Sequence, residues 1–272
     1  MPGLIEWPVP EPAIPEDTHP LLAGAARAAA AAFGSARAEL DRAALAEKVL
    51  DGADGTPTTR LDLRVDTALG EFAERERINL ISEELGHIDN GSATTLVTDP
   101  VDGTANAVAG VPLAAFAGVL AVDGTAREAL TCWLDTGRCW TAHAGAPARY
   151  RTSGRTGLDG AAVSLLRPHP GKSAGWFRVA ERAGRIRILS STCLEAVLVA
   201  EGATDAFADA GSDTHRIVDL AAAMVTVPAA GGTVLDLHGR PLELDPDLRR
   251  RWSGIIAASR PLAEELAATI LG

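Results

Sequence analysis

The segment Asp99-Pro-Val-Asp-Gly-Thr-Ala-Asn106 is the stretch around which the rest of this sequence is organised. It follows Thr-Thr-Leu-Val-Thr at 94–98, and the β-branched residues of that run favour a short buried β-strand. Pro100 has no backbone N–H, so we expect the strand to end there and the chain to turn sharply. The turn then presents the carboxylates of Asp99 and Asp102 together at the carboxyl end of the strand.

Two kinds of ligand suit this segment. Paired carboxylates suit a hard divalent cation, which prefers several oxygen ligands. Gly103 lets the backbone approach a ligand closely, and the following N–H groups can face a phosphate if a helix begins there. The alternative is an ordinary solvated turn, because Asp-Pro and Asp-Gly pairs are common turn signals. Acidic residues elsewhere in the sequence decide between these interpretations.

The composition is that of an acidic globular protein. Of the 272 residues, 47% are hydrophobic and 22% are charged, and the formal net charge is -11. This charge argues against binding to nucleic acid or to an anionic membrane, although metal ions can still reverse the sign at a phosphate site. The apolar runs are too short for a transmembrane helix, and the first residues lack the pattern of a signal peptide.

The cysteines indicate the redox environment. Cys132, Cys139 and Cys193 are odd in number and form no CxxC pair. A structural zinc site or a disulfide framework is therefore not expected, and we expect a cytoplasmic protein. Cys193 falls on the apolar face of a predicted helix, which favours a place in the core.

The sequence divides into an arm and two halves. Residues 1–19 are rich in proline and acidic residues and are expected to form an extended arm. The amino-terminal half covers residues 20–150 and contains most of the candidate ligands. A connection rich in Gly, Pro and Arg then leads into the carboxyl-terminal half, residues 151–272, which is expected to complete the site.

Helices and strands are both expected in the first half. An alanine-rich helix is predicted from Pro20 to Ala32, and apolar residues at helical spacing after Gly34 predict a second helix reaching about Leu50. Chain breakers at 51–57 predict a loop before the next helix. The predicted strands cover residues 79–82, 94–98, 114–122, 129–134 and 138–142, with hairpin turns at 123–124 and 136–137.

The second half alternates strands and helices. Such alternation with mixed connections predicts an α/β fold of layered sheets and helices. The predicted strands cover residues 161–166, 185–189, 204–208 and 232–237, the predicted helices cover 172–183, 192–201 and 217–229, and a final strand and helix lie within 255–271.

Five motifs occur together in an order that points to one family. They are Asp54-Gly-Thr-Pro-Thr-Thr-Arg-Leu-Asp62, Ser82-Glu-Glu84, the segment 99–106, Ile217-Val-Asp-Leu-Ala-Ala-Ala223 and Ala230-Gly-Gly232. In this combination the sequence resembles the inositol monophosphatase family over residues 20–272. That family lies within the magnesium-dependent, lithium-sensitive phosphatases that include fructose-1,6-bisphosphatase. The resemblance implies an αβαβα sandwich.

The resemblance also implies a site for two to three Mg²⁺ ions. One ion would be bound by Glu83, Asp99 and the backbone carbonyl of Val101, and a second by Asp99, Asp102 and Asp219. Taken alone, Glu83 could be a solvated loop acid and Asp219 an ordinary acid at a helix N-terminus. Four acids at four positions of the family pattern favour the metal site.

A phosphatase needs a water nucleophile and neutralisation of the phosphate charge. By the resemblance, Thr104 orients the attacking water, Asp62 polarises the Thr104 hydroxyl, and Glu83 shares the role of base. The backbone amides of Gly103 and Thr104 would bind the phosphate.

The residues expected to contact the substrate are less distinctive. Ser191 occupies the family's Gly-Ser-Ala position. Asp209 ends a segment that resembles the stretch whose last acid binds substrate hydroxyls; the alternative is a solvated acid at the end of an edge strand. His215 and Arg216 precede Asp219 and could face either the substrate or solvent, of which we favour solvent.

The implied function is a magnesium-dependent phosphomonoesterase that hydrolyses a small hydroxylated phosphate of the inositol or sugar type, acting as a homodimer. Histidinol-phosphate phosphatase, fructose-1,6-bisphosphatase and nucleotide 3′-phosphatase activities remain open. So does a catalytically idle phosphate-binding regulator, although Thr104 and Asp62 are both retained. Departures from the family pattern at Leu96, Ala107 and Val218 remove no ligand but loosen the choice of substrate.

Overall fold

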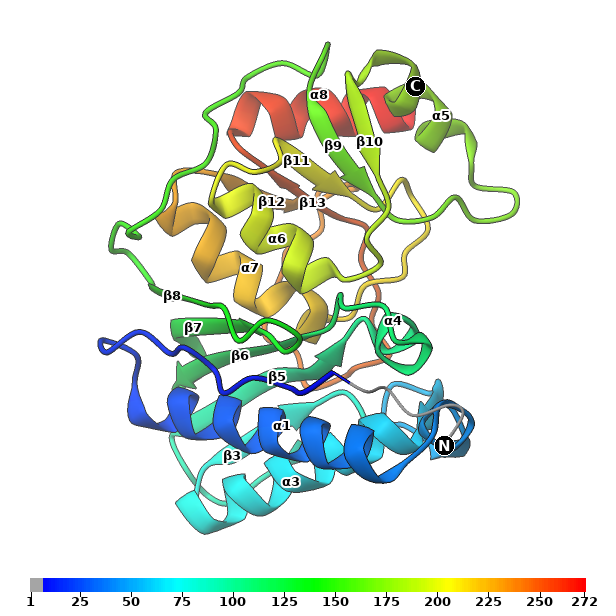
Figure 1. Ribbon diagram of the computed structural model, residues 1–272. Coiled ribbons are helices and arrows are strands. Elements are labelled where there is room, and N and C mark those ends of the chain that lie inside the picture. The colour runs from blue at the N-terminus through cyan, green and yellow to red at the C-terminus, as the bar shows by residue number, and fades with distance from the viewer. Residues whose placement is uncertain (1–6) are drawn as a thin grey trace.

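The amino-terminal part of the chain forms a six-stranded sheet with two long helices on its outer face (Figure 1). The computed structural model describes residues 7–272. The elements of this part are α1 (Pro20–Glu39), α2 (Arg42–Leu45), β1 (Lys48–Asp51), β2 (Pro57–Thr59), α3 (Arg60–Glu76), β3 (Asn79–Ser82), β4 (Gly86–Ile88), β5 (Thr94–Asp102), α4 (Thr104–Ala109), β6 (Ala115–Val122), β7 (Thr125–Trp133) and β8 (Cys139–His143). The sheet order is β4-β3-β5-β6-β7-β8, with β3 and β5 parallel and the other neighbours antiparallel.

The remaining chain forms a five-stranded mixed sheet with helices on both faces (Figure 1). Its elements are β9 (Ala162–Leu165), α5 (Ala174–Arg182), β10 (Arg185–Arg187), α6 (Thr192–Ala200), β11 (Ala206–Ala208), α7 (Ile217–Ala229), β12 (Thr233–Asp236), β13 (Gly254–Ala257) and α8 (Arg260–Leu271). The strand order is β10-β9-β11-β13-β12, in which β13 runs antiparallel to both of its neighbours.

Five layers alternate through the molecule, as Figure 1 shows from bottom to top. Helices α1 and α3 cover the outer face of the first sheet, α6 and α7 lie between the two sheets, and α5 and α8 cover the second sheet. Three apolar cores fill the four helix–sheet interfaces, and the largest of them packs both faces of the α6–α7 layer against the two sheets. Layered packing of this kind buries the apolar stripe of every helix against a sheet, and it confirms the predicted layered α/β fold.

The proposed boundary between residues 150 and 151 lies in the segment that connects the two sheets, because β8 ends at residue 143 and β9 begins at residue 162. Part of the expected arm, residues 1–6, lies outside the described residues. Within the rest of the arm, Ala13 forms a parallel bridge with Arg138. No helix in residues 7–272 is long and apolar enough to cross a membrane.

The prediction that Pro100 ends its strand is wrong. Strand β5 continues to Asp102, and its pairing with β6 shifts between Asp99, which is opposite Ala117, and Asp102, which is opposite Ala115. One extra residue on β5 makes this a β-bulge, and a bulge accommodates a residue that cannot donate a ladder hydrogen bond. Both carboxylates therefore belong to β5, and the bulge changes the directions in which their side chains point.

The prediction that α1 stops near Ala32 is also wrong. The helix continues through Gly34 to Glu39, because Phe33 and Ala36 are fully buried against the sheet and this packing outweighs the roughly 1 kcal/mol cost of a helical glycine. The second helix expected up to Leu50 is reduced to the short α2, and a hairpin of β1 and β2 follows it.

Candidate active site

The carboxylates of β5 meet acids from two other elements. One side-chain oxygen from each of Glu83, Asp99 and Asp219 lies within 4.8 Å of the others. Glu83 follows the end of β3, whereas Asp219 is in the first turn of α7. Asp99 is 1% exposed, and its Oδ1 has no hydrogen-bond partner among the described residues. The structure thus brings together three of the predicted metal ligands.

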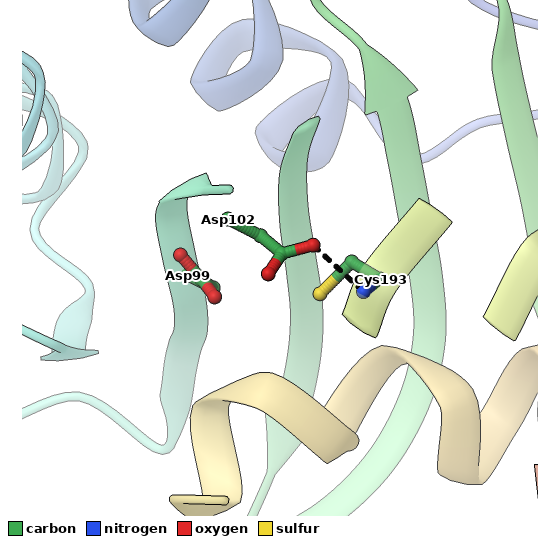
Figure 2. Close-up of side chains that lie close together, drawn as sticks. All are labelled: Asp99, Asp102 and Cys193. Atoms are coloured by element: carbon green, nitrogen blue, oxygen red, sulfur yellow. Dashed lines mark hydrogen bonds between the residues drawn. The ribbon is translucent and has the colours of Figure 1, made fainter. Parts of the chain in front are cut away.

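Asp102 points toward the start of α6 (Figure 2), and one of its carboxylate oxygens still lies within 4.8 Å of an oxygen of Asp99. Its carboxylate accepts hydrogen bonds from the Ser191 hydroxyl at 2.5 Å, the Cys193 backbone N–H at 2.8 Å and the Thr192 backbone N–H at 3.2 Å. The carboxylate therefore caps α6, where the free N–H groups of a helix start favour a negative charge. Ser191, expected to contact substrate, is buried against Asp102 in this structure.

Asp62 and Thr104 are brought into contact by local helix chemistry. Thr59 begins α3 as its N-cap and forms a capping box with Asp62, whose Oδ2 accepts the Thr59 hydroxyl at 2.6 Å. The other oxygen, Oδ1, lies 2.7 Å from the Thr104 hydroxyl, and the carbonyl of Val101 lies 3.0 Å from the same hydroxyl. Burial raises the pKa of Asp62, against the hydrogen bonds from Thr59 and Thr104.

Gly103 makes the turn that starts α4. Its φ of 86° is in the left-handed region, and a Cβ at this position would lie 2.5 Å from the carbonyl oxygen of Leu113. Glycine is therefore required both by the backbone conformation and by the close approach of the neighbouring chain. The turn places Thr104 at the first position of α4, next to the carboxylates of β5.

Arg216 lies inside the acidic cluster, so the expectation that it faces solvent is wrong. Its guanidinium binds both oxygens of Asp219, contacts Oδ2 of Asp54 at 2.9 Å and forms an ion pair with Glu83. The expectation for His215 is wrong as well. That ring is buried, with Nδ1 accepting the Gly254 backbone N–H at 3.1 Å.

The signal for Arg216 was present in the sequence. A residue three positions before an acid at the start of a helix is in the spacing of a capping box, and its backbone N–H does bind Oδ2 of Asp219 at 2.6 Å. Asp66 was also overlooked, although it lies one turn after Asp62 on α3. Its carboxylate binds the Ser82 hydroxyl and the backbone N–H of Glu84 at 2.9 Å, and so fixes the loop that carries Glu83.

The pKa values reflect an excess of buried negative charge. Burial raises the pKa of Asp99 well above its usual range, and the nearby carboxylates raise it further. Burial likewise raises the pKa of Glu83, with Arg216 opposing the rise, and it raises the pKa of Asp102 to about 6. Burial also tends to raise the pKa of Asp219. The charge and hydrogen bonds of the Arg216 guanidinium outweigh this effect and hold the pKa of Asp219 below its usual range.

These features fit a divalent cation. The donors are hard carboxylate oxygens, and the unpartnered Oδ1 of Asp99 is a buried acceptor that an ion would satisfy. The Cys193 sulfur also lies near Asp99 and Asp102, but burial and these carboxylates raise the pKa of its thiol well above the usual range. A protonated thiol is a poor ligand for a hard cation, so Cys193 belongs to the core, as predicted.

Asp209 is placed differently from either interpretation of the sequence. It follows β11, which is a central strand of its sheet, so it is not a solvated acid at the end of an edge strand. Its exposure is 0%, and its oxygens accept hydrogen bonds from Ser212 N–H at 2.8 Å and from the backbone and hydroxyl of Thr214. This carboxylate holds its own loop together and does not line an open surface.

Comparison with known proteins points to the family that the motifs of the sequence resemble. The model of the inositol monophosphatase family matches residues 17–271. A fructose-1,6-bisphosphatase/inositol-1-monophosphatase from Thermococcus kodakarensis is 32% identical over 202 residues, covering 71% of this chain and 73% of that protein. A bifunctional NADP phosphatase/NAD kinase from Methanococcus maripaludis is 30% identical over 249 residues, covering 81% of this chain; the chain spans only 44% of that protein.

A solved structure described as an inositol monophosphatase-fructose 1,6 bisphosphatase superposes with a TM-score of 0.77 at 24% identity. The match covers 92% of this chain and 96% of that one. At this identity the superposition supports the fold alone, and it agrees with the layered arrangement of the two sheets. Because the family match runs through both sheets and through every motif of the site, the chain belongs to the inositol monophosphatase family.

Proposed function

We propose that this protein hydrolyses a small hydroxylated phosphate ester of the inositol or sugar type with the help of bound Mg²⁺. The family makes it a phosphoric monoester hydrolase. The observation that carries the proposal is the contact between Thr104 and Asp62 beside the cluster of Glu83, Asp99 and Asp219. A hydroxyl that is held by a buried carboxylate is what a phosphatase needs to orient a water molecule, and a simple metal-binding protein has no use for it.

The proposed ligands of the ions are Glu83, Asp99, the Val101 carbonyl, Asp102 and Asp219. When bound, Mg²⁺ would supply charge neutralisation for the phosphate and lower the pKa of a bound water. Support for this assignment comes from the clustered oxygens and from the unpartnered oxygen of Asp99. We propose two to three ions.

The protein's own groups would then position the reactants. With Oδ1 of Asp62 as acceptor of the Thr104 hydrogen, the hydroxyl oxygen of Thr104 keeps its lone pairs free to accept a hydrogen from water. The proposed phosphate contacts are the backbone N–H groups of Gly103 and Thr104 at the start of α4, where the turn exposes free donors. Glu83 is the proposed second base.

The substrate is proposed at the level of a class. The relatives' names include fructose-1,6-bisphosphatase, inositol-1-monophosphatase and NADP phosphatase, so single and double phosphates both have precedents. Asp209 gives no reason to prefer a single over a double phosphate, because both of its oxygens accept hydrogen bonds within its own loop. We propose that Ser191 acts on the substrate indirectly, through its hydrogen bond to the proposed metal ligand Asp102. A homodimer in the cytoplasm is likewise proposed from the family.

A phosphate-release assay tests the proposal. We expect turnover of inositol 1-phosphate or a sugar phosphate in the presence of Mg²⁺, and none after chelation, because the acidic cluster repels a phosphate dianion until cations bind. The panel includes fructose 1,6-bisphosphate, histidinol phosphate, a nucleotide 3′-phosphate and NADP. Binding of phosphate without turnover of any ester would favour the idle regulator, and turnover in chelator would refute the metal mechanism.

A further inference from the structure

One guanidinium connects three acids that come from three separate elements. Arg216 is the N-cap of α7, and its Nε and Nη2 lie 3.2 Å and 2.8 Å from the two oxygens of Asp219. Its Nη1 lies 2.9 Å from Oδ2 of Asp54, in the loop between β1 and β2, and also forms an ion pair with Glu83 after β3. The same group therefore joins both halves of the site.

The charge at this point is unbalanced in favour of the acids. Among residues 7–272, Arg216 is the only basic side chain that forms an ion pair with Glu83 or with Asp219. The side chain of Arg216 is 18% exposed and that of Asp219 is 6% exposed, so these charges are only weakly screened by solvent. Removing the cation from such a cluster would leave buried like charges without compensation.

Glu83 and Asp219 are also two of the proposed ligands. A carboxylate oxygen that accepts a short hydrogen bond from a guanidinium has less capacity left for a metal ion, and a positive charge beside the ion lowers its affinity further. Asp219 does not depend on the guanidinium for its orientation, because the backbone N–H of Arg216 binds its Oδ2 at 2.6 Å. The guanidinium can therefore leave while the carboxylate stays in place.

We propose that Arg216 is a built-in competitor of the metal: it binds Glu83 and Asp219 in the metal-free protein, keeps the acidic cluster assembled, and is displaced when Mg²⁺ binds. This inference rests on the proposed metal site. Arg216 would then set the Mg²⁺ concentration at which the enzyme binds its metal ions. In this arrangement the protein binds Mg²⁺ less tightly, but the acidic cluster stays folded in the absence of metal.

The test is the Mg²⁺ affinity of wild-type protein and of Arg216→Gln, measured by isothermal titration calorimetry with Mg²⁺ alone. We expect Arg216→Gln to bind Mg²⁺ at least about tenfold more tightly, since one positive charge is removed from the ligands. The metal-free variant should melt at a lower temperature than metal-free wild type, and Mg²⁺ should raise its melting temperature by more. Equal or weaker affinity of the variant would overturn the proposal.

Arg240 provides a matched control. It binds both oxygens of Asp236 in a similar two-pronged arrangement, at 2.6 Å and 2.8 Å, and also Asp213, but it pairs with none of the proposed ligands. Arg240→Gln should lower the melting temperature while leaving the Mg²⁺ affinity within about threefold of wild type. A comparable gain in affinity for Arg240→Gln would show that net charge, and not the place of Arg216, governs the effect, and would overturn the assignment.

A measurement without substitution covers the case in which Arg216→Gln does not fold. In wild-type protein the Nε–H of Arg216 donates to Asp219, so its NMR signal should be protected from exchange without metal and lose protection as Mg²⁺ is added. Protection that is unchanged at saturating Mg²⁺ would refute displacement. Wild-type protein that binds no Mg²⁺ at all would instead refute the metal site itself, so the two failures can be told apart.

Discussion

The Thr104 hydroxyl lies 2.7 Å from Oδ1 of Asp62, although the two residues are 42 positions apart in the chain. Each is fixed by a helix start: Asp62 by the capping box of α3, and Thr104 by the glycine turn before α4. Two ordinary helix caps thus generate the pair to which we assign the orientation of water. The geometry does not depend on a flexible loop, and this makes the pair a clear target for substitution.

Thr104→Val should lower kcat by about 10² or more, because it removes the hydroxyl while keeping the shape of the side chain. The melting temperature should fall as well, because Oδ1 of the buried Asp62 loses its hydrogen-bond donor. The readout is phosphate release under saturating Mg²⁺ and substrate. Thr131→Val is the control, since Thr131 is a buried threonine of β7 whose hydroxyl has no partner. If both variants keep full turnover, Thr104 has no role in the reaction.

Asp99→Asn should have opposite effects on activity and on stability. Activity should fall by about 10³ or more, as for loss of a preorganised electrostatic group. The metal-free protein should melt at a higher temperature, because asparagine replaces an acid whose ionised form is disfavoured by burial and by three neighbouring carboxylates. Assays of phosphate release and calorimetry in chelator measure the two effects.

Asp123→Asn is the control for Asp99→Asn. Asp123 is exposed in the hairpin turn between β6 and β7 at a φ of 50°, which asparagine tolerates. Neither activity nor stability should change there. A metal-free Asp99→Asn protein that is less stable than wild type would contradict the picture of repelling carboxylates.

Asp209→Ala should destabilise the protein by about 1–3 kcal/mol, because Ser212 and Thr214 lose their shared buried acceptor. Urea unfolding measures this loss, and KM for the best substrate is measured in parallel. A tenfold rise in KM with unchanged stability would restore the interpretation of Asp209 as a substrate contact.

Glu195→Gln should remove part of the pH dependence of stability. Glu195 is fully buried on α6, and burial raises its pKa to about 8 from an ordinary value of 4.5. The folded state therefore favours the protonated acid, so its contribution to stability is present below about pH 4.5 and is lost as the pH rises toward 8. Glutamine stays neutral throughout.

Urea unfolding of both proteins at pH 5 and pH 8 tests this sign. The stability of Glu195→Gln relative to wild type should increase between these pH values by more than about 1 kcal/mol. An advantage that does not grow with pH would mean that Glu195 is ionised in the folded protein.

Features set by local chemistry could be predicted from the sequence. Helix α7 runs from Ile217 to Ala229, as its apolar pattern predicts, and the motif order places Asp99 and Asp219 in one site. The strand at 79–82 is likewise where the sequence predicts it. In each case the residues that decide the structure are close in sequence or belong to a motif.

Features set by tertiary contacts could not be predicted in this way. Gly34 alone predicts a break in the helix, but packing against the sheet keeps α1 continuous through it. Pro100 alone predicts the end of a strand, but the pairing with β6 accommodates it in a bulge. The surroundings of Arg216 depend on a loop that comes from a distant part of the chain. Asp209 is buried within its own loop, where Ser212 and Thr214 donate hydrogen bonds to it. Their burial reverses what an isolated charged residue suggests.

Asp102 belongs to β5 of the first sheet, yet three of its hydrogen bonds come from the start of α6, which packs on β11 of the second. A hinge motion that separated the sheets would pull this carboxylate away from its donors. Opening of the two halves like a clamshell would therefore break all three of these bonds. The same carboxylate that is a proposed metal ligand thus also ties the first sheet to the helix layer between the two sheets.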